Sequence, residues 1–543
     1  MIVTKMAKMQ KLLLPALILT TPFLVFLNYN SYGLACAETW ILLGGLILFA
    51  TVCSVVMLLG GSKVSGLMMA ALITAFIDLQ FTPTNLPDWV DEWTFILLFA
   101  GMQTFVLCLF LKEKFYAIAT AIFLTFFIVT LLQLTLPSKD NDSLFEHHES
   151  AAHAPPRIIH LVLDEHIGIE GIPTDIDGGL ATKNLITQFY LKNGFQLFGG
   201  AFSHYFNTHI SIPSMLNFSD DIRNAPYVSV GRGFALSRNN YFGLLSQKKY
   251  NIDVLSSGYL NFCLSKVVIA ECQYDFGTLH TFAKLELATS QKLQVLTSRY
   301  LDQSSVVSFL IRKFVLPHEF LRSWTWAFEL DRTRLNSLST LYGLKVLWKD
   351  IASLPQGTAL FAHLMIPHSP YVANADCSIR PPSRDFLWYS TNKFSSADGP
   401  TNTVASRRDR YKLYFEQLSC LYLRLDELVD RMRAVGIYDD SIIILHGDHG
   451  SRIGINEPTS RNQHALTNQD VVDGFSTLFA MKLPSKPGGY DKLARPLEEL
   501  FAKFVFEAGL TSTNILPGKA EPYVYLLVDH DRDPIRIPYV PLH

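Results

Sequence analysis

Long apolar runs dominate the N-terminal part of the chain. Five of them lie at about Leu12–Leu27, Trp40–Leu59, Val64–Phe81, Trp93–Leu111 and Phe115–Leu136. A helix needs about 20 predominantly apolar residues to cross a bilayer core, so each run predicts a membrane-spanning helix. Asp78 lies near the end of the third run, where its carboxylate could reach the interface. For the first run alone, a cleaved signal peptide ending near Cys36 is the alternative.

Charged residues between the runs predict the topology. Lysines stand before the first run, after the second and before the fifth, at Lys5, Lys8, Lys11, Lys63, Lys112 and Lys114. The two remaining loops contain acidic residues and no Lys or Arg. Positively charged loops stay in the cytoplasm, which places the N-terminus there. Five helices then put everything after Leu136 on the outer side.

The rest of the chain alternates strand-like and helical patterns. The polar segment 138–156 predicts an exposed linker, although its histidines could bind metal. Nearly continuous apolar runs, typical of strands covered on both faces, lie at Arg157–Leu163, Ile252–Ser256, Thr358–Met365, Ser441–His446 and Phe475–Met481. A long helical pattern covers Arg407–Ala434. The alternation predicts an α/β domain with a mainly parallel sheet.

These patterns divide the chain into four parts. We expect a five-helix transmembrane domain at 1–137, a linker at 138–156, an α/β catalytic domain at 157–484 and a C-terminal subdomain at 485–543. The last part combines a helix with a hairpin formed by Val524–Val528 and Ile535–Val540.

Composition excludes one class of function and suggests a compartment. The net charge is −2 and no basic block follows the N-terminus, so nucleic-acid binding has no electrostatic support. Four of the seven cysteines lie in the globular part, and an even number in an exported domain predicts disulfides. The expected pairs are Cys263 with Cys272 and Cys377 with Cys420; four free thiols are the alternative.

Two predicted strands run directly into metal-binding residue types. The strand at 157–163 is followed by Asp164 and Glu165, and the strand at 441–446 by Gly447, Asp448 and His449. Carboxylates at the carboxyl ends of parallel strands are well placed to bind a cation. A solvated acid pair and an ordinary Gly-rich turn are the respective alternatives.

Two further segments carry candidate chemistry. Thr208 and Ser211 stand just before a predicted helix, where a hydroxyl near a metal would be a nucleophile, or would simply cap the helix. His368, between two prolines after a predicted strand, could hydrogen-bond an anionic substrate or belong to a structural loop.

Together these segments resemble the alkaline phosphatase-like superfamily. More narrowly, they resemble membrane-bound sulfatase-type enzymes, which include lipoteichoic acid synthases and phosphoethanolamine transferases. The resemblance implies an alkaline phosphatase-like α/β domain and Thr208 as nucleophile, with His368 and His464 contacting the substrate. The metal ligands it implies are Asp164, Glu165, Thr208, Asp448 and His449.

One departure from the sulfatase pattern points toward phosphoryl transfer. Sulfatases proper carry a Cys-x-Pro-Ser-Arg signature, whereas Ser211-Ile-Pro-Ser214 is followed here by Met215. A site of the serine type at Ser211 stays open. The acid pair Asp164-Glu165 is intermediate between the sulfatases' Asp-Asp and the transferases' single Glu.

The resemblance predicts a metal-dependent phosphoryl-group transferase with a covalent threonine intermediate. We expect Mn, Zn, Ca or Mg as the metal, membrane lipid and envelope glycan as substrates, and a multi-pass location in a bacterial plasma membrane. The catalytic domain would be periplasmic or extracellular. Alternatives are a sulfatase or phosphodiesterase that uses water, and a non-catalytic membrane scaffold.

Overall fold

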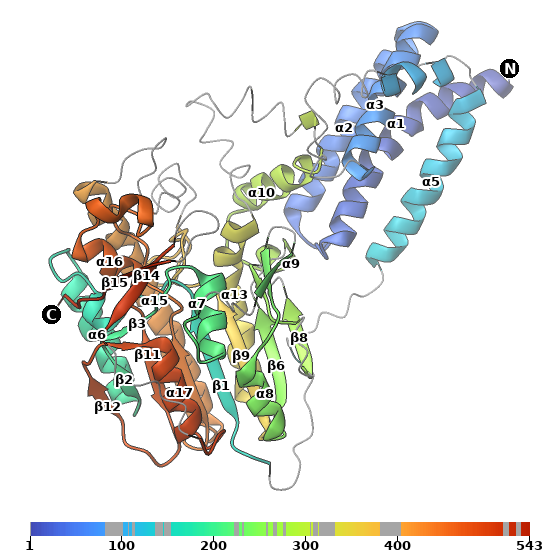
Figure 1. Ribbon diagram of the computed structural model, residues 1–543. Helices are drawn as coiled ribbons and strands as arrows, with labels where there is room; N and C mark the ends of the chain where they lie inside the picture. Colours follow the sequence, from blue (N-terminus) through green and yellow to red (C-terminus); the bar gives the residue numbers. More distant parts are fainter. Residues whose placement is uncertain are drawn as a thin grey trace. The chain divides into compact units, whose positions relative to one another are not determined.

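The chain forms two compact units (Figure 1). The computed structural model describes residues 2–81, 101–106, 108–110, 114–135, 145, 154–221, 227–230, 233–256, 259–263, 269–274, 279–304, 306–307, 313, 332–380, 403–513, 521–527 and 534–542. One unit comprises Met1–Asp140 and Phe282–Leu330, and the other Asn141–Thr281 and Asp331–His543. We call them the helical unit and the α/β unit.

Four helices of the helical unit are long and apolar enough to cross a membrane. They are α1 (Ile2–Tyr29), α2 (Ala37–Leu59), α3 (Gly61–Phe81) and α5 (Lys114–Thr135). Apolar side chains such as Leu48 and Leu132 are exposed on their outer faces, as expected for surfaces that contact lipid. The predicted run Trp93–Leu111 lies mostly outside the described residues, and its described part is helical. The described residues thus contain four candidate spans instead of five, and the fifth stays a prediction.

A segment from much later in the chain completes the helical unit. Helix α10 (Thr289–Leu301) packs against α2, and the ring of Tyr300 lies 5.2 Å from that of Phe23. Asp78 is buried within this unit, and its carboxylate accepts hydrogen bonds from the Ser304 hydroxyl and the Val306 amide.

A sheet of eight strands organises the α/β unit, in the order β12-β2-β11-β10-β1-β9-β6-β8. The strands are β1 (Ile158–Leu163), β2 (Gln196–Phe198), β6 (Asn251–Ser256), β8 (Glu271–Tyr274), β9 (Thr358–Leu364), β10 (Ile442–His446), β11 (Phe479–Lys482) and β12 (Gly489–Asp491). All pairings are parallel except those of β11 with β10 and β2. The predicted mainly parallel sheet is therefore confirmed.

Helices cover the sheet (Figure 1), and three of them pack on it around a hydrophobic core. The main helices are α6 (Gly179–Lys192), α7 (Thr208–Leu216), α8 (Asn240–Gln247), α13 (Arg332–Ala352), α15 (Val404–Ala434), α16 (Asn468–Phe475) and α17 (Leu497–Glu507). The core buries Met215 of α7, Phe242 of α8 and Phe501 of α17 against the strands. Because β1, β9 and β10 are buried along their whole length, their sequences are nearly continuous apolar runs, with a histidine in each.

Shorter elements complete the unit. They are β3 (Ala201–Phe202), β4 (Tyr227–Val230), β5 (Gly233–Leu236), β7 (Leu260–Asn261), β13 (Arg495–Pro496), β14 (Tyr523–Leu526), β15 (Ile535–Pro538), α9 (Leu279–Ala283), η1 (Ile169–Gly171) and η5 (Ser460–Ala465). The antiparallel pair β14–β15 is the hairpin expected near the C-terminus. The predicted strand at 475–481 was wrong at its start, because Phe475 still belongs to α16 and β11 begins at Phe479.

Two disulfides join Cys263 to Cys272 and Cys377 to Cys420. We expect the double change Cys377→Ser and Cys420→Ser to destabilise the α/β unit by about 4 kcal/mol, because the bridge closes a loop of 43 residues. Thermal unfolding of the detergent-solubilised chain should show a midpoint lower by on the order of 5–10 °C. The free cysteine Cys36, changed to Ser, is the control. Equal midpoints for all three proteins would contradict the expectation.

Candidate metal centre and active site

The candidate site lies at the carboxyl ends of three neighbouring strands. β1 pairs in parallel with β10 on one side and with β9 on the other, so their carboxyl ends meet at one edge of the sheet. Asp164 and Glu165 follow β1, and Asp448 and His449 follow β10. The loop after β9 carries His368. Residues more than 280 positions apart in the chain thereby come into contact.

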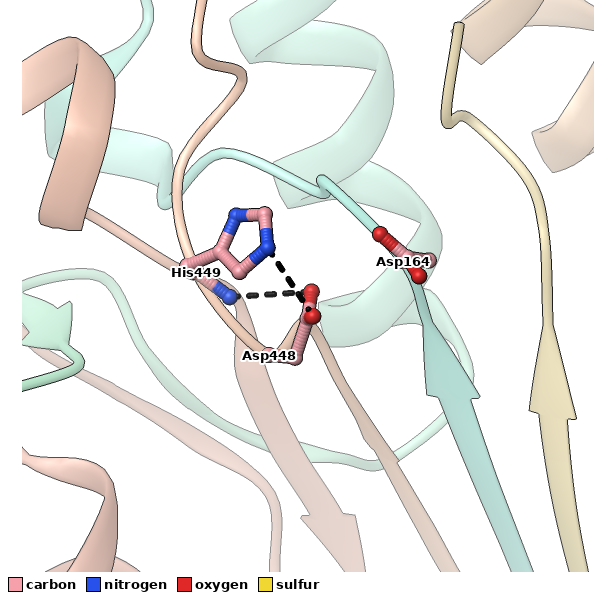
Figure 2. A group of neighbouring side chains, drawn as sticks. All are labelled: Asp164, Asp448 and His449. Carbon is pink, nitrogen blue, oxygen red and sulfur yellow. Dashed lines mark hydrogen bonds and ion pairs between the residues drawn. The ribbon is translucent and has the colours of Figure 1, made fainter. Parts of the chain in front are cut away.

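Asp164, Asp448 and His449 form the first cluster of possible ligands (Figure 2). All three are buried, and one ligand atom from each lies within 4.8 Å of the others. Asp448 Oδ1 accepts hydrogen bonds from the backbone amides of Glu165 and His449, both at 3.0 Å. These two hydrogen bonds hold the Asp448 carboxylate in its position within the cluster.

A second cluster shares Asp164 and adds Glu165 and His368. Glu165 Oε2 accepts a hydrogen bond from the Ser369 amide, and Oε1 lies 3.5 Å from His368 Nε2. Glu165 has a φ of 62°, which is uncommon for a residue with a side chain and costs conformational energy. The Tyr414 hydroxyl donates to the Glu165 carbonyl and helps to hold this backbone in place.

Buried carboxylate oxygens in these clusters fit a divalent cation. Among the described residues, Asp164 Oδ1 is buried without a hydrogen-bond partner, and Asp448 Oδ2 makes an ion pair with His449 Nε2 at 3.1 Å. Burying such oxygens is costly unless a cation satisfies them. His449 Nδ1 lies 3.0 Å from the Gly450 carbonyl, and donation there leaves Nε2 facing Asp448 as a ligand nitrogen. The donor set of carboxylate oxygens with imidazole nitrogen thus suits a divalent metal.

The electrostatics keep the cluster ready for a cation. Burial alone would raise the pKa of the Asp448 carboxyl, but the adjacent His449 holds it well below its usual value. Burial likewise opposes protonation of His449, yet Asp448 raises the pKa of this imidazole. Asp448 is therefore ionised over the whole physiological pH range.

Thr208 is the first residue of α7, and its hydroxyl faces the metal-binding residues. Its Oγ1 lies 3.2 Å from His449 Nε2. The capping position of α7 belongs to Asn207, whose side chain makes no capping hydrogen bond. The hydroxyl of Thr208 thus contacts the site, as a nucleophile requires.

Ser211, the other hydroxyl expected near the helix start, is engaged elsewhere. It is fully buried, donates to the Asp448 carbonyl at 2.5 Å and lies 2.7 Å from the Ser203 hydroxyl. These contacts give Ser211 a structural role in supporting the Asp448 loop and leave Thr208 as the hydroxyl at the ligand cluster.

The sequence analysis did not predict two of the residues at the site, and one residue that it did predict lies away from the site. His363 Nε2 lies 3.0 Å from Asp164 Oδ2, and Arg452 Nη1 lies 3.7 Å from Glu165 Oε1. The only feature of the sequence that could have indicated them is their position, at the end of β9 and in the loop after β10. His464 is exposed on η5, and no contact described in the structure joins it to either cluster.

Comparisons with known proteins find a relative of one of the enzyme types that the motifs resemble. No family model matches the chain. Lipoteichoic acid synthase of Staphylococcus saprophyticus is 29% identical over 108 residues, which are 19% of this chain and only 16% of that protein. The whole protein's activity is therefore argued from the site.

Similar solved structures include the C-terminal periplasmic domain of EptC from Escherichia coli in complex with zinc (11% identity, TM-score 0.41, 72% of this chain and 94% of that chain). Others are phosphonate monoester hydrolase of Agrobacterium radiobacter (12%, 0.40, 68% and 80%) and an alkaline phosphatase superfamily protein of Vibrio parahaemolyticus (11%, 0.37, 73% and 78%). The neighbours thus include a member of the superfamily that the motifs resemble. At such TM-scores they carry no functional argument.

Proposed function

We propose that this chain is a membrane-anchored, metal-dependent enzyme of the alkaline phosphatase type. It transfers a phosphoryl-containing group, of the phosphoethanolamine or phosphoglycerol type, from a lipid phosphodiester to a hydroxyl of an envelope lipid or glycan. The observation that carries the proposal is the Thr208 hydroxyl, which lies 3.2 Å from His449 Nε2 beside the buried carboxylates of Asp164 and Asp448.

The metal would be held by Asp164, Glu165, Asp448 and His449, with Thr208 at its edge. When bound, a divalent ion supplies stabilisation of the negative charge on the transferred group and lowers the pKa of a nearby hydroxyl. Mn, Zn, Ca and Mg all accept part of this donor set.

The chain's own residues would carry two displacement steps. In the first, Thr208 Oγ1 forms a bond to phosphorus while the bond from phosphorus to the lipid oxygen breaks, and the lipid leaves as an alcohol. In the second, an acceptor hydroxyl forms a bond to phosphorus and the Thr208 oxygen leaves. In the first step the departing lipid oxygen takes up a proton, equivalent to the one that Thr208 loses. In the second step the proton released by the acceptor hydroxyl restores the hydroxyl of Thr208. His368, beside Glu165, would hydrogen-bond the transferred group and orient it.

The disulfides and the distribution of lysines support a location of the α/β unit outside the cytoplasm. Disulfides persist in oxidising compartments, and both lie in the α/β unit. The alternation of lysines together with five spans would place this unit on the outer side of a bacterial plasma membrane. The anchor would then keep the site close to a lipid donor.

Substrate choice tests the proposal against a sulfatase. The purified, metal-loaded full chain should turn over an aryl phosphodiester at least about 100-fold faster than the matching aryl sulfate, measured as kcat/KM. After incubation with membrane phospholipid, mass spectrometry of the Thr208 peptide should show an adduct whose mass identifies the transferred group. A preference for the sulfate ester, or turnover without any adduct, would contradict the proposed transferase function.

A further inference from the structure

Arg452 stands in a rigid turn beside the metal-binding residues. It follows Gly450 by two positions, and its φ of 56° is uncommon for a residue with a side chain. Its backbone amide donates to the Asp473 carbonyl at 2.8 Å, and the Gly450 amide donates to the Gly474 carbonyl at 3.0 Å. These bonds to the end of α16 fix where the Arg452 side chain begins.

The guanidinium of Arg452 donates no hydrogen bond among the described residues. Its Nε is buried without a partner, and the nearest carboxylate oxygen, Glu165 Oε1, is 3.7 Å from Nη1. The side chain is 20% exposed and passes over the ring of Phe206. A guanidinium has five N–H donors and stays charged at any pH a protein survives, so donors facing a site require an acceptor.

Other buried arginines of the α/β unit are engaged in hydrogen bonds. Arg407 makes a two-point contact with Asp473 at 2.8 and 3.1 Å. Arg410 donates to the carbonyl of Gly454 at 3.3 Å. Arg424 leaves its Nε without a partner but donates to Glu427 through Nη1. Arg452 differs from these arginines because its guanidinium makes no hydrogen bond within the described residues and only the 3.7 Å ion pair with Glu165.

Arg452 lies near the segment that carries Thr208, the proposed nucleophile. The guanidinium carbon of Arg452 lies 5.9 Å from the centroid of the Phe206 ring, and Phe206 stands two residues before Thr208. Nη1 of Arg452 lies 3.7 Å from Glu165 Oε1. Arg452 therefore has both Glu165 and the segment that leads into α7 as neighbours.

We propose that Arg452 binds the non-bridging oxygens of the transferred phosphate group, beside Glu165. This inference rests on the proposed function, from which the phosphate is taken, and it names the group that Arg452 recognises as a tetrahedral oxyanion. A guanidinium fork presents two parallel N–H groups that match two oxygens of such an anion, which a lysine ammonium cannot do. Arg452 is thus assigned as a substrate-binding residue.

Binding of inorganic phosphate to the metal-loaded, detergent-solubilised full chain tests the assignment without any turnover. By calorimetry, R452A should raise the Kd for phosphate by about 10- to 100-fold, as expected for lost hydrogen bonds to a charged group. R452K should recover only part of the affinity, because it keeps the charge without the fork. R424A, at an arginine of similar exposure on α15, is the matched control and should bind phosphate as the wild type does.

Metal content and the unfolding midpoint separate this role from a structural one. Both Arg452 variants should retain the wild-type metal stoichiometry and unfold within a few degrees of the wild type. An unchanged Kd in R452A, or equal loss of metal from R452A and R452K, would overturn the assignment. Weakened phosphate binding in R452A supports it even if no adduct forms at Thr208, in which case the proposed transfer fails while the anion site stands.

Discussion

Replacing Thr208 with alanine is expected to lower phosphodiester turnover by on the order of 10⁴-fold or more, as removal of a covalent nucleophile does in other enzymes. The variant keeps the backbone of α7 and loses the hydroxyl that contacts His449 together with the γ-methyl group. Steady-state kinetics with an aryl phosphodiester measure the loss. Mass spectrometry after incubation with phospholipid should detect no adduct on this peptide.

Two variants serve as controls for the role of Thr208. Thr208→Ser retains a hydroxyl at the same position and should form the adduct at a reduced rate. Ser211→Ala removes the hydrogen bond to the Asp448 carbonyl and should lower stability by about 1 kcal/mol while adduct formation persists. Wild-type turnover in Thr208→Ala would exclude Thr208 from the mechanism, and loss of the adduct only in Ser211→Ala would move the nucleophile there.

Changing Asp448 to asparagine is expected to weaken metal binding by at least about 100-fold. Loss of a residue that only hydrogen-bonds a metal ligand already lowers metal affinity about 10- to 100-fold, and a residue that binds the metal directly contributes more. The substitution preserves shape, and an amide oxygen can still accept from the amides of Glu165 and His449. The negative charge at the cluster is lost. Elemental analysis of the purified full chain gives the stoichiometry, and titration of the metal-stripped protein gives the affinity.

Asp470→Asn is the matched control for this loss. Asp470 is equally buried, and its carboxylate also accepts backbone amides, from Ile455 and Asn456, but it lies in α16 outside both ligand clusters. This variant should keep its metal even if it unfolds more easily. Stoichiometric metal in Asp448→Asn would refute the proposed centre. A wild-type protein that binds no metal would instead favour the non-catalytic scaffold.

Much of the architecture follows from local patterns. The length of an apolar run depends only on neighbouring residues, so the spans of α1, α2, α3 and α5 were predictable without a fold. The same holds for β1 and β10, because burial on both faces makes their sequences nearly continuous in apolar residues. An acid placed directly after such a strand must lie at its carboxyl end. For this reason the strand-end positions of Asp164 and Asp448 were predictable, whereas the pairing of β1 with β10, which makes them neighbours, depends on the tertiary structure.

The sequence by itself therefore determined the apolar spans, the class of the α/β unit and the strand-end acids, because each depends on residues close together in the chain. Only the tertiary structure decided that Thr208, not Ser211, faces His449, and that Arg452 and His363 border the carboxylates. It also decided that α10 packs with the helical unit. These outcomes depend on side-chain directions and on packing between segments far apart in sequence, where a rotation of one helix exchanges one hydroxyl for another.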